Sequence, residues 1–316
     1  MKILISGSTG LIGEALMAAL RADGVEAVRL ARRPTADPHV LWDPAAGTID
    51  KAGLEGFDAV VHLAGKSIAA GRWTRKLKDE ILQSRVVGTE LLAQSLAGLA
   101  RPPKAFVCAS AIGFYGSRGA EALGETSPAG SGYLPEVCKA WEAAAEPARQ
   151  KGLRVAHVRF GVVLSDRGGA LAKMLLPFKL GVGGVIGNGE QYMGWIALED
   201  AVGALRHALD TPTLEGPLNA VAPQTLTNRE FTKALGRALH RPTIFPLPGF
   251  AARLVLGEMA EALLLASQRV EPRRLLESGE VDSVKRLAAE VGMRDVKYFS
   301  QQFKAQFGKG PSEYLG

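Results

Sequence analysis

The stretch that decides the fold lies at the start of the chain: Lys2-Ile3-Leu4-Ile5-Ser6-Gly7-Ser8-Thr9-Gly10-Leu11-Ile12-Gly13. An apolar run predicts a strand, glycines then recur at every third position, and Leu11, Leu16 and Leu20 continue at helical spacing. Such a turn lets the backbone approach a ligand closely. It also directs the free N–H groups and the positive dipole end of the new helix at an anion, for which a pyrophosphate is the natural occupant.

The position of this turn favours dinucleotide binding. It lies between a predicted strand and a predicted helix, as the dinucleotide-binding fingerprint requires. An ordinary strand-to-helix turn is the alternative interpretation. The predicted cofactor contacts in this stretch are Gly7, Thr9, Gly10, Leu11, Ile12 and Gly13.

The end of the next apolar run, 27–31, points to the type of dinucleotide, because Arg32 and Arg33 follow it. An NAD enzyme usually carries an acid here that holds the ribose hydroxyls, whereas two cations suit the additional 2′-phosphate of NADP. A solvated pair of loop charges is the alternative. At this position we favour NADP(H) as the cofactor.

Composition sets broad limits on the class of protein. The chain has 316 residues, 47% of them hydrophobic and 22% charged, as in an ordinary globular protein. Its net charge of +6 permits an anionic ligand or nucleic acid and requires neither. Cys108 and Cys138 have no CxxC spacing and the five histidines no metal spacing, so we predict neither a disulfide scaffold nor a metal site.

The N-terminal apolar run is too short for a signal peptide, and prolines and charges break the apolar region 245–266. We therefore expect a cytoplasmic protein with no membrane partner.

Further apolar runs alternate with helical segments along the first half of the chain. The runs 40–42, 58–65, 106–110 and 155–160 predict strands, and 76–99 and about 134–149 predict helices. This alternation predicts an α/β fold with a doubly wound parallel sheet.

The alternation weakens after residue 180. The glycine-rich loop 181–189 is either a lid or substrate clamp or a flexible surface turn. From Pro223 onward the chain reads as mostly helical, which predicts a small lobe over the carboxyl ends of the strands.

Several motifs together resemble the extended short-chain dehydrogenase/reductases of the NAD-dependent epimerase/dehydratase group. These motifs are the glycine turn, His62-Leu63-Ala64-Gly65, Ser110 with Gly113-Phe114-Tyr115-Gly116, and Trp195-Ile196-Ala197-Leu198-Glu199-Asp200. More narrowly, the stretches 71–74, 84–89, 138–142 and 270–276 look like the YfcH-like epimerase family. The resemblance implies an NADP-binding Rossmann domain over 1–239 and a small C-terminal domain over 240–279.

One departure from the family pattern affects the chemistry. Extended members place Tyr-x-x-x-Lys at the start of the helix after the fifth strand, where the tyrosine exchanges the proton. Leu134 and Cys138 occupy those two positions here, flanked by Tyr133 and Lys139. Residues six apart do not share a helix face. Dinucleotide binding is therefore implied, and ordinary dehydrogenase chemistry is not.

The resemblance also implies the remaining site residues. The resemblance implies that the cofactor is contacted by Leu63, Ala64, Gly65 and Arg85. Ser110 matches the superfamily's catalytic serine, a hydrogen-bond donor to a substrate carbonyl, and it also lies beside the cofactor. Tyr115 is the nearest phenol able to serve as an acid.

The candidate substrate contacts are Lys66, Arg159 and Trp195. Structural roles are the alternative for each of these candidates: a strand-end cap for Ser110, core packing for Tyr115 and Trp195, an ion pair for Arg159 and a solvated charge for Lys66.

The tail, residues 280–316, resembles the second helix-turn-helix of AraC-type regulators, with Phe299, Phe303 and Phe307 on one predicted helical stripe. It carries six Lys/Arg and five Asp/Glu. Because DNA affinity comes largely from phosphate neutralisation, this half-module should bind DNA poorly alone. Two other interpretations of the tail stay open: it is a grafted segment, or its phenylalanine stripe docks on the C-terminal lobe.

These features predict an NADP(H)-binding atypical oxidoreductase or epimerase-like enzyme that acts on an unidentified small molecule. A non-catalytic NADP sensor or scaffold is the second hypothesis, and a cofactor-sensing DNA-binding regulator is the third. The sequence leaves the oligomeric state open, and a homodimer is one possibility.

Overall fold

The computed structural model describes residues 1–278. The chain divides into one compact unit over Met1–Arg274 and a second over Leu275–Gly316. The predicted tail, 280–316, lies outside the described residues. Residues 240–274, predicted to form part of a small C-terminal domain, belong to the same unit as the sheet. Over residues 1–278, no helix is both long and apolar enough to cross a bilayer.

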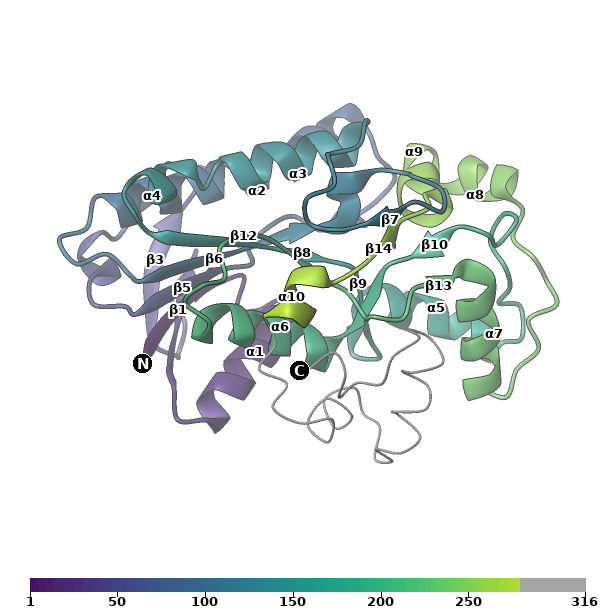
Figure 1. Cartoon of the computed structure of the whole chain (residues 1–316), viewed down its shortest axis with the longest axis horizontal. Helices are drawn as coiled ribbons and strands as arrows, with labels where there is room; N and C mark the ends of the chain where they lie inside the picture. The colour runs from purple at the N-terminus through teal and green to yellow at the C-terminus, as the bar shows by residue number, and fades with distance from the viewer. Residues whose placement is uncertain (279–316) are drawn as a thin grey trace. The chain divides into compact units, whose positions relative to one another are not determined.

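The central sheet of the first unit has eight strands in the order β12-β8-β6-β5-β1-β2-β3-β4 (Figure 1). Adjacent strands are parallel, except that β4 is antiparallel to β3. The strands are β1 (Lys2–Ser6), β2 (Glu26–Ala31), β3 (His39–Asp43), β4 (Thr48–Ile49), β5 (Ala59–His62), β6 (Ala105–Ala111), β8 (Arg154–Phe160) and β12 (Gly216–Ala220). The predicted doubly wound parallel sheet is confirmed.

The order of the strands locates the ligand-binding edge. The chain adds β2 and β3 on one side of β1 and then places β5 and β6 on the other side. In open α/β sheets, ligands bind beyond the carboxyl ends of the strands where this winding direction reverses. The glycine turn follows β1 at that point.

Helices cover both faces of the sheet, with α2, α3 and α4 on one face and α1 and α6 on the other (Figure 1). Their bounds are α1 (Leu11–Ala22), α2 (Arg75–Ala97), α3 (Tyr133–Ala143), α4 (Glu146–Gln150) and α6 (Leu198–Asp210). Because both faces are covered, the central strands are continuously apolar: Leu4, Val60 and Phe106 have no exposed surface.

The predicted helix over 134–149 is divided into α3 and α4, which is the main local correction to the sequence-based elements. The break falls at Ala144 and Ala145, just before Pro147. Proline has no N–H group, and its ring clashes with the carbonyl four residues earlier, so it favours a helix break here, with Pro147 in the first turn of α4.

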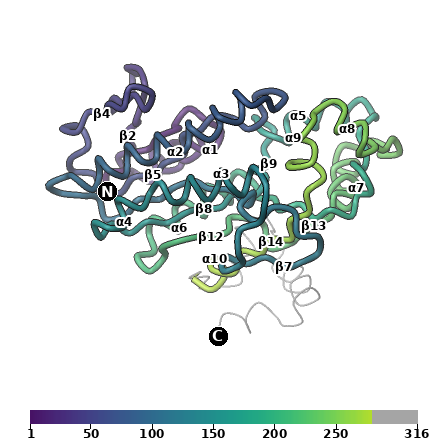
Figure 2. The backbone as a smooth tube through the Cα atoms, turned by 90° about the horizontal axis from the view of Figure 1, so that it is seen from above, coloured from purple at the N-terminus to yellow at the C-terminus, as the bar shows by residue number. Residues whose placement is uncertain are grey.

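Smaller elements, all but β7 of which follow α4 in the chain, surround the carboxyl edge of the sheet. They are β7 (Ala122–Leu123), β9 (Val162–Ser165), α5 (Gly169–Lys179), β10 (Tyr192–Met193), β11 (Trp195–Ala197), β13 (Leu226–Thr227), α7 (Asn228–Ala238), α8 (Gly249–Leu256), α9 (Glu258–Ala260), β14 (Arg269–Val270) and α10 (Arg273–Glu277). In Figure 2, α5, α7, α8 and α9 lie at the same end of the first unit, and Figure 1 shows α8 and α9 above α5 and α7 there.

The glycine-rich loop 181–189 is held against the segment 244–247. Gly184 forms an isolated bridge with Ile244, and the Leu247 amide donates to the Val185 carbonyl at 2.8 Å. A Cβ at Gly184 would lie 1.8 Å from the Phe245 carbonyl oxygen, so this position requires glycine. The loop is thus a paired segment in this structure, and the lid or clamp role remains a prediction.

Candidate cofactor and active site

The glycine turn after β1 has the close backbone contacts of a phosphate-binding loop. Gly7 has φ +65, and a Cβ there would lie 2.6 Å from the Leu63 carbonyl carbon. A Cβ at Gly13 would lie 2.2 Å from the Gly7 carbonyl oxygen. Two of the glycines are therefore required so that the loop can fold tightly between β5 and α1.

The third glycine, Gly10, is the N-cap of α1 and provides no side-chain cap for the first turn. Gly10 and Thr9 are exposed, while Leu11 and Ile12 are half-buried. The amide groups of this turn can thus serve an anionic ligand.

Arg29 on β2 holds the glycine turn in place, although the sequence analysis did not identify it. Its guanidinium donates to the Ser8 carbonyl and to the Asp37 carboxylate, both at 2.8 Å. The Arg29 hydrogen bond, together with one from Arg21, lowers the pKa of Asp37. An arginine inside an apolar strand is the signal that could have indicated this role.

Arg32 and Arg33 follow the carboxyl end of β2, and both are exposed. Among the described residues, no carboxylate lies within the 4.0 Å ion-pair distance of either guanidinium. Both side chains are therefore available to an anionic ligand beside the glycine turn.

The turn after β5, Leu63-Ala64-Gly65, is fixed from β1. The Ser6 hydroxyl accepts hydrogen bonds from the amides of Leu63 at 3.1 Å and Ala64 at 3.3 Å, and it lies 2.6 Å from His62 Nδ1. His62 is fully buried, and burial lowers its pKa to about 4. The imidazole is therefore neutral at pH 7, with the Ser6 proton directed at Nδ1.

Arg85 on α2 lies directly against Gly65. Its Nη1 donates to the carbonyls of Lys66 at 2.9 Å and Ile81 at 3.0 Å, and its guanidinium stacks over the Trp141 ring at 4.9 Å. A Cβ at Gly65 would lie 3.3 Å from Arg85 Cζ. In this structure Arg85 positions the turn after β5, and cofactor contact by it remains a prediction.

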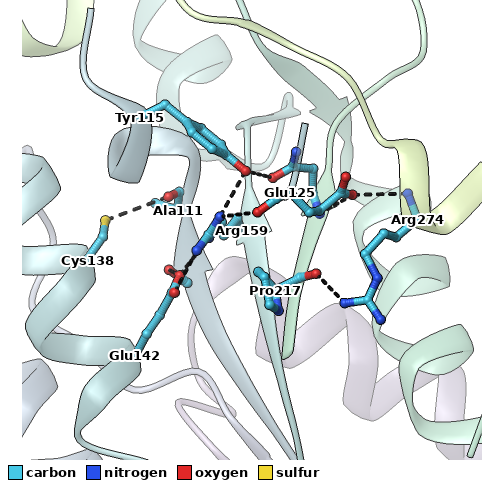
Figure 3. A network of polar contacts seen from close by, with 10 residues as sticks. Ala111, Tyr115, Glu125, Cys138, Glu142, Arg159, Pro217 and Arg274 are labelled. Atoms are coloured by element: carbon cyan, nitrogen blue, oxygen red, sulfur yellow. Dashed lines mark hydrogen bonds and ion pairs between the residues drawn. The ribbon is translucent and has the colours of Figure 1, made fainter. Parts of the chain in front are cut away.

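A buried polar network lies at the carboxyl ends of β6 and β8 (Figure 3). The Ser110 hydroxyl donates to Glu142 Oε1 at 2.6 Å, and Arg159 donates to both Glu142 carboxylate oxygens at 2.8 Å. The Arg159 and Glu142 side chains are only 4% and 13% exposed. Arg159 was predicted to contact substrate, and it lies instead in a buried structural ion pair. Ser110 was predicted to donate a hydrogen bond to a substrate carbonyl, but its only proton is directed at Glu142, so it can only accept a hydrogen bond from a ligand.

Tyr115 belongs to the same network and has no exposed surface. Its hydroxyl donates to Asn219 Oδ1 at 2.7 Å and accepts from Arg159 Nη1 at 2.9 Å. Burial raises the pKa of Tyr115. A fully enclosed phenol with both hydrogen-bonding directions in use does not favour the predicted role of a substrate acid.

Glu125 extends the network toward the end of the first unit. Its carboxylate accepts from the Asn219 amide at 3.1 Å and the Arg274 amide at 3.2 Å. Asn219 also donates to the Glu271 carbonyl at 3.0 Å. These side chains come from distant parts of the sequence, and none was a predicted site residue.

The positions of the missing Tyr-x-x-x-Lys pair face the loop after β6. A Cβ on Gly113 would lie 3.3 Å from Leu134 Cβ and 3.7 Å from Cys138 Sγ. Cys138 donates to the Ala111 carbonyl at 3.7 Å, and burial raises the pKa of its thiol to about 12. An aliphatic side chain and a neutral thiol thus occupy the two positions.

Tyr133 and Lys139 do not replace that pair. The Tyr133 hydroxyl donates to the Lys78 carbonyl at 2.7 Å, and its ring packs against Trp73. Burial raises the pKa of Tyr133 to about 12. Lys139 is exposed on another face of α3.

The two other predicted substrate contacts lie apart from the network. Lys66 forms an ion pair with Glu80 on α2. Trp195 is half-buried on β11, and its buried indole N–H has no acceptor among the described residues. In the part of the chain that the structure describes, no His, Cys, Asp and Glu side chains cluster as metal ligands.

Comparison with known proteins agrees with this geometry. A family model described as the NAD dependent epimerase/dehydratase family matches residues 3–220, most of the chain. The chain belongs to the NAD dependent epimerase/dehydratase family. A second model, a domain of unknown function, matches 247–279. The narrower YfcH-like assignment remains a prediction.

Relatives are similar to this protein over most of its length. The Epimerase family protein Mb2239 of Mycobacterium bovis is 44% identical over 280 residues, covering 88% of this chain and 92% of the relative. The human Epimerase family protein SDR39U1 is 39% identical over 292 residues, covering 92% and 98%. A crystal structure of human SDR39U1 (isoform2) with NADPH superposes with a TM-score of 0.81 at 39% identity, covering 88% of this chain and 94% of that one.

A model of AraC-family regulatory helix-turn-helix proteins matches residues 276–315. Nearly all of that match lies outside the described residues, so the predicted resemblance of the tail gains no structural test.

Proposed function

We propose that this epimerase-family chain binds NADP(H) and acts as an atypical oxidoreductase or epimerase-like enzyme on a small molecule. The observation that carries the proposal is the pair of exposed guanidinium groups of Arg32 and Arg33, which have no carboxylate partner within residues 1–278 and follow β2 beside the glycine turn. The NADPH in the structure of the human relative supports it. Where an NAD enzyme would place an acid, this chain offers two donors for a 2′-phosphate.

The local structure of the glycine turn fits a bound dinucleotide. Glycine at positions 7 and 13 lets the turn fold tightly where a Cβ would clash with backbone atoms, and the uncapped start of α1 provides amide donors. Arg29 and Ser6 fix the backbone on the two sides of this turn. NADP(H), when bound, supplies a hydride donor or acceptor.

The chain's own contribution to the chemistry centres on Ser110. Because its proton is directed at Glu142, Ser110 would accept a hydrogen bond from a hydroxyl or amide group of a ligand. The same carboxylate accepts two hydrogen bonds from the buried Arg159 guanidinium, which fixes Glu142 where it receives the Ser110 proton. Ser110 is thus proposed to orient a donor group, which differs from the predicted contact with a carbonyl.

Binding of nucleotide fragments tests the cofactor proposal without a known substrate. 2′,5′-ADP carries the 2′-phosphate, whereas 5′-AMP does not. We expect 2′,5′-ADP to raise the Tm of the full chain more than 5′-AMP does, and this difference to disappear in Arg32→Ala/Arg33→Ala. The double variant Arg101→Ala/Lys104→Ala, which removes two exposed cations elsewhere, is the matched control. Equal Tm shifts for the two nucleotides in the unmodified chain would contradict the proposal.

A non-catalytic NADP sensor is the second candidate, and Leu134 and Cys138 in place of the proton-transfer pair favour it. The two candidates differ in turnover: hydride transfer or epimerisation of any small molecule that depends on Ser110 would exclude the sensor.

A further inference from the structure

An unusual concentration of apolar side chains lies exposed on the elements around α5 and α8. We call the following set the apolar face: Leu176, Leu180, Val182, Ile244, Phe245, Phe250, Leu254 and Val255. Their exposed fractions run from 56% for Phe245 to 76% for Leu254. Soluble proteins rarely leave so many large apolar side chains together in water, so a group of this kind marks an interaction site.

Helix α8 is the clearest case, because three of its large apolar side chains are exposed, whereas Leu256 packs against a core cluster. Phe250 and Leu254, four residues apart, share one side of the helix and are 71% and 76% exposed. Ala252, in contrast, is 1% exposed. Packing within the first unit does not account for this arrangement.

Backbone and side-chain contacts connect the segments that carry the apolar face. Gly184 forms a bridge with Ile244, and Arg241 Nε donates to the Lys179 carbonyl at 2.8 Å. Leu265 would contact a Cβ at either Gly187 or Gly249, so it connects the glycine-rich loop to the start of α8. Figure 2 shows α5 and α8 at the same end of the first unit, and Figure 1 shows α8 above α5 at that end.

Positive charge is concentrated in the same segments. Residues 169–187 and 229–257 contain seven Lys/Arg and one Glu, a formal charge of +6, which equals the net charge of the whole chain. The rest of the chain is therefore neutral overall. Two of the seven cations, Arg229 and Arg253, are paired with Glu190 and Glu261 respectively.

Four basic side chains line a single surface hollow immediately before the apolar segment. Lys233, Arg237, His240 and Arg241 surround a volume of about 560 Å³, completed by Gly236, Pro242 and Thr243. No carboxylate lines this hollow. Its chemistry suits phosphate groups, and its neighbours Ile244 and Phe245 suit hydrocarbon.

We propose that the apolar face and the basic hollow form a peripheral docking surface for an anionic lipid bilayer. Exposed aromatic and aliphatic side chains can enter the headgroup boundary, while the surrounding cations are attracted to anionic headgroups. The sequence-based expectation of no membrane partner rested on the lack of a spanning segment, and a peripheral surface does not need one.

Charge argues against the other occupants. A second copy of the chain, docked symmetrically through this face, would bring two strongly positive surfaces together. Nucleic acid would meet the cations, but the apolar side chains between them would face phosphates, whereas nucleic-acid interfaces are polar. A bilayer with anionic lipids satisfies both kinds of side chain.

Sedimentation with vesicles tests this proposal on the full chain. We expect binding to vesicles of equimolar phosphatidylcholine and phosphatidylglycerol, none to pure phosphatidylcholine, and weaker binding as salt rises. Phe250→Ser/Leu254→Ser should lower the partition coefficient more than about tenfold. Lys233→Gln/Arg237→Gln should lower it roughly 30-fold if each charge contributes as cations near anionic membranes usually do.

Matched control variants distinguish binding through this surface from nonspecific adsorption to vesicles and from misfolding. Leu41→Ser/Val87→Ser removes exposed apolar side chains elsewhere, and Arg101→Gln/Lys104→Gln removes the same charge elsewhere. Both should bind vesicles like the unmodified chain, and all variants should keep its Tm. Absent vesicle binding, equal losses in the controls, or a stable dimer that only Phe250→Ser/Leu254→Ser dissociates would overturn the proposal.

Discussion

Glu142 on α3 and Arg159 on β8 form a two-pronged ion pair, with both N–O distances at 2.8 Å, inside the carboxyl edge of the sheet. The pair joins the last turn of α3, the helix that lacks the usual proton-transfer residues, to the end of β8, and Glu142 also accepts the hydrogen bond from Ser110 on β6. It also sets which hydrogen bonds Ser110 and Tyr115 can still make. The pair is therefore the structural centre of the candidate active site.

Loss of the Glu142 charge should be costly. Glu142→Gln leaves the Arg159 guanidinium, 4% exposed, without a compensating anion, and we expect the free energy of unfolding to fall by about 3 kcal/mol. Urea denaturation measures this. Glu146→Gln, whose partner Arg149 is 67% exposed, is the control and should cost less than about 1 kcal/mol. Equal losses in the two variants would show that the buried pair has no special weight.

The hydroxyl of Tyr115 should contribute to stability. Tyr115→Phe leaves Asn219 Oδ1 and Arg159 Nη1 without one partner each in a buried site, so we expect a loss of about 1–3 kcal/mol in the free energy of unfolding. Tyr133→Phe, in a half-buried position, is the comparison and should lose less. An unchanged stability of Tyr115→Phe would contradict the structural role given to this residue.

The buried histidine on β5 should make stability depend on pH. Burial lowers the pKa of His62 from 6.5 to about 4, so between these values the unfolded chain binds a proton that the folded chain does not. The free energy of unfolding should therefore fall as pH falls, by about 2 kcal/mol between about pH 7 and about pH 5 from this residue alone. His62→Phe should flatten that part of the curve, whatever its absolute stability. A curve of the same slope would rule out His62 as the source.

A negative charge at the start of α1 should repel the cofactor. Gly10 is exposed and its Cβ position is 3.3 Å from the nearest atom, so Gly10→Asp should fold with little loss of stability. We expect its affinity for NADPH, measured by fluorescence titration, to fall more than about tenfold, because the added carboxylate competes with a pyrophosphate. Ala18→Asp adds the same charge to an exposed position of the same helix and should bind normally. Equal affinities in the two variants would mean that the pyrophosphate lies elsewhere.

Much of the sheet could be predicted because the physics there is local. Strands that helices cover on both faces are continuously apolar, as Ile3, Leu4 and Ile5 are. The three glycines of the turn lie within seven consecutive residues, so their pattern is visible in the sequence. The division of the predicted helix over 134–149 was also within reach, since Pro147 was visible in the sequence.

The active-site network could not be predicted, because its partners are far apart in sequence. The hydrogen bond from Tyr115 to Asn219 joins residues that are 104 positions apart in the sequence. The hydrogen bond from the Arg274 backbone amide to Glu125 joins residues that are 149 positions apart. Hydrophobic periodicity carries no information on such pairs. For the same reason the sequence suggested a substrate role for Arg159, which the structure pairs with Glu142.

The central claim is that Arg32 and Arg33 make this member of the epimerase family a binder of NADP(H). The most direct measurement is the ratio of the dissociation constants for NADH and NADPH, by calorimetry, in the unmodified chain and in Arg32→Ala/Arg33→Ala. We predict that the unmodified chain binds NADPH at least about tenfold more tightly than NADH, and that the double variant loses this preference while its affinity for NADH is unchanged. Equal affinities for the two dinucleotides in the unmodified chain, or a preference that survives the double substitution, would contradict the account.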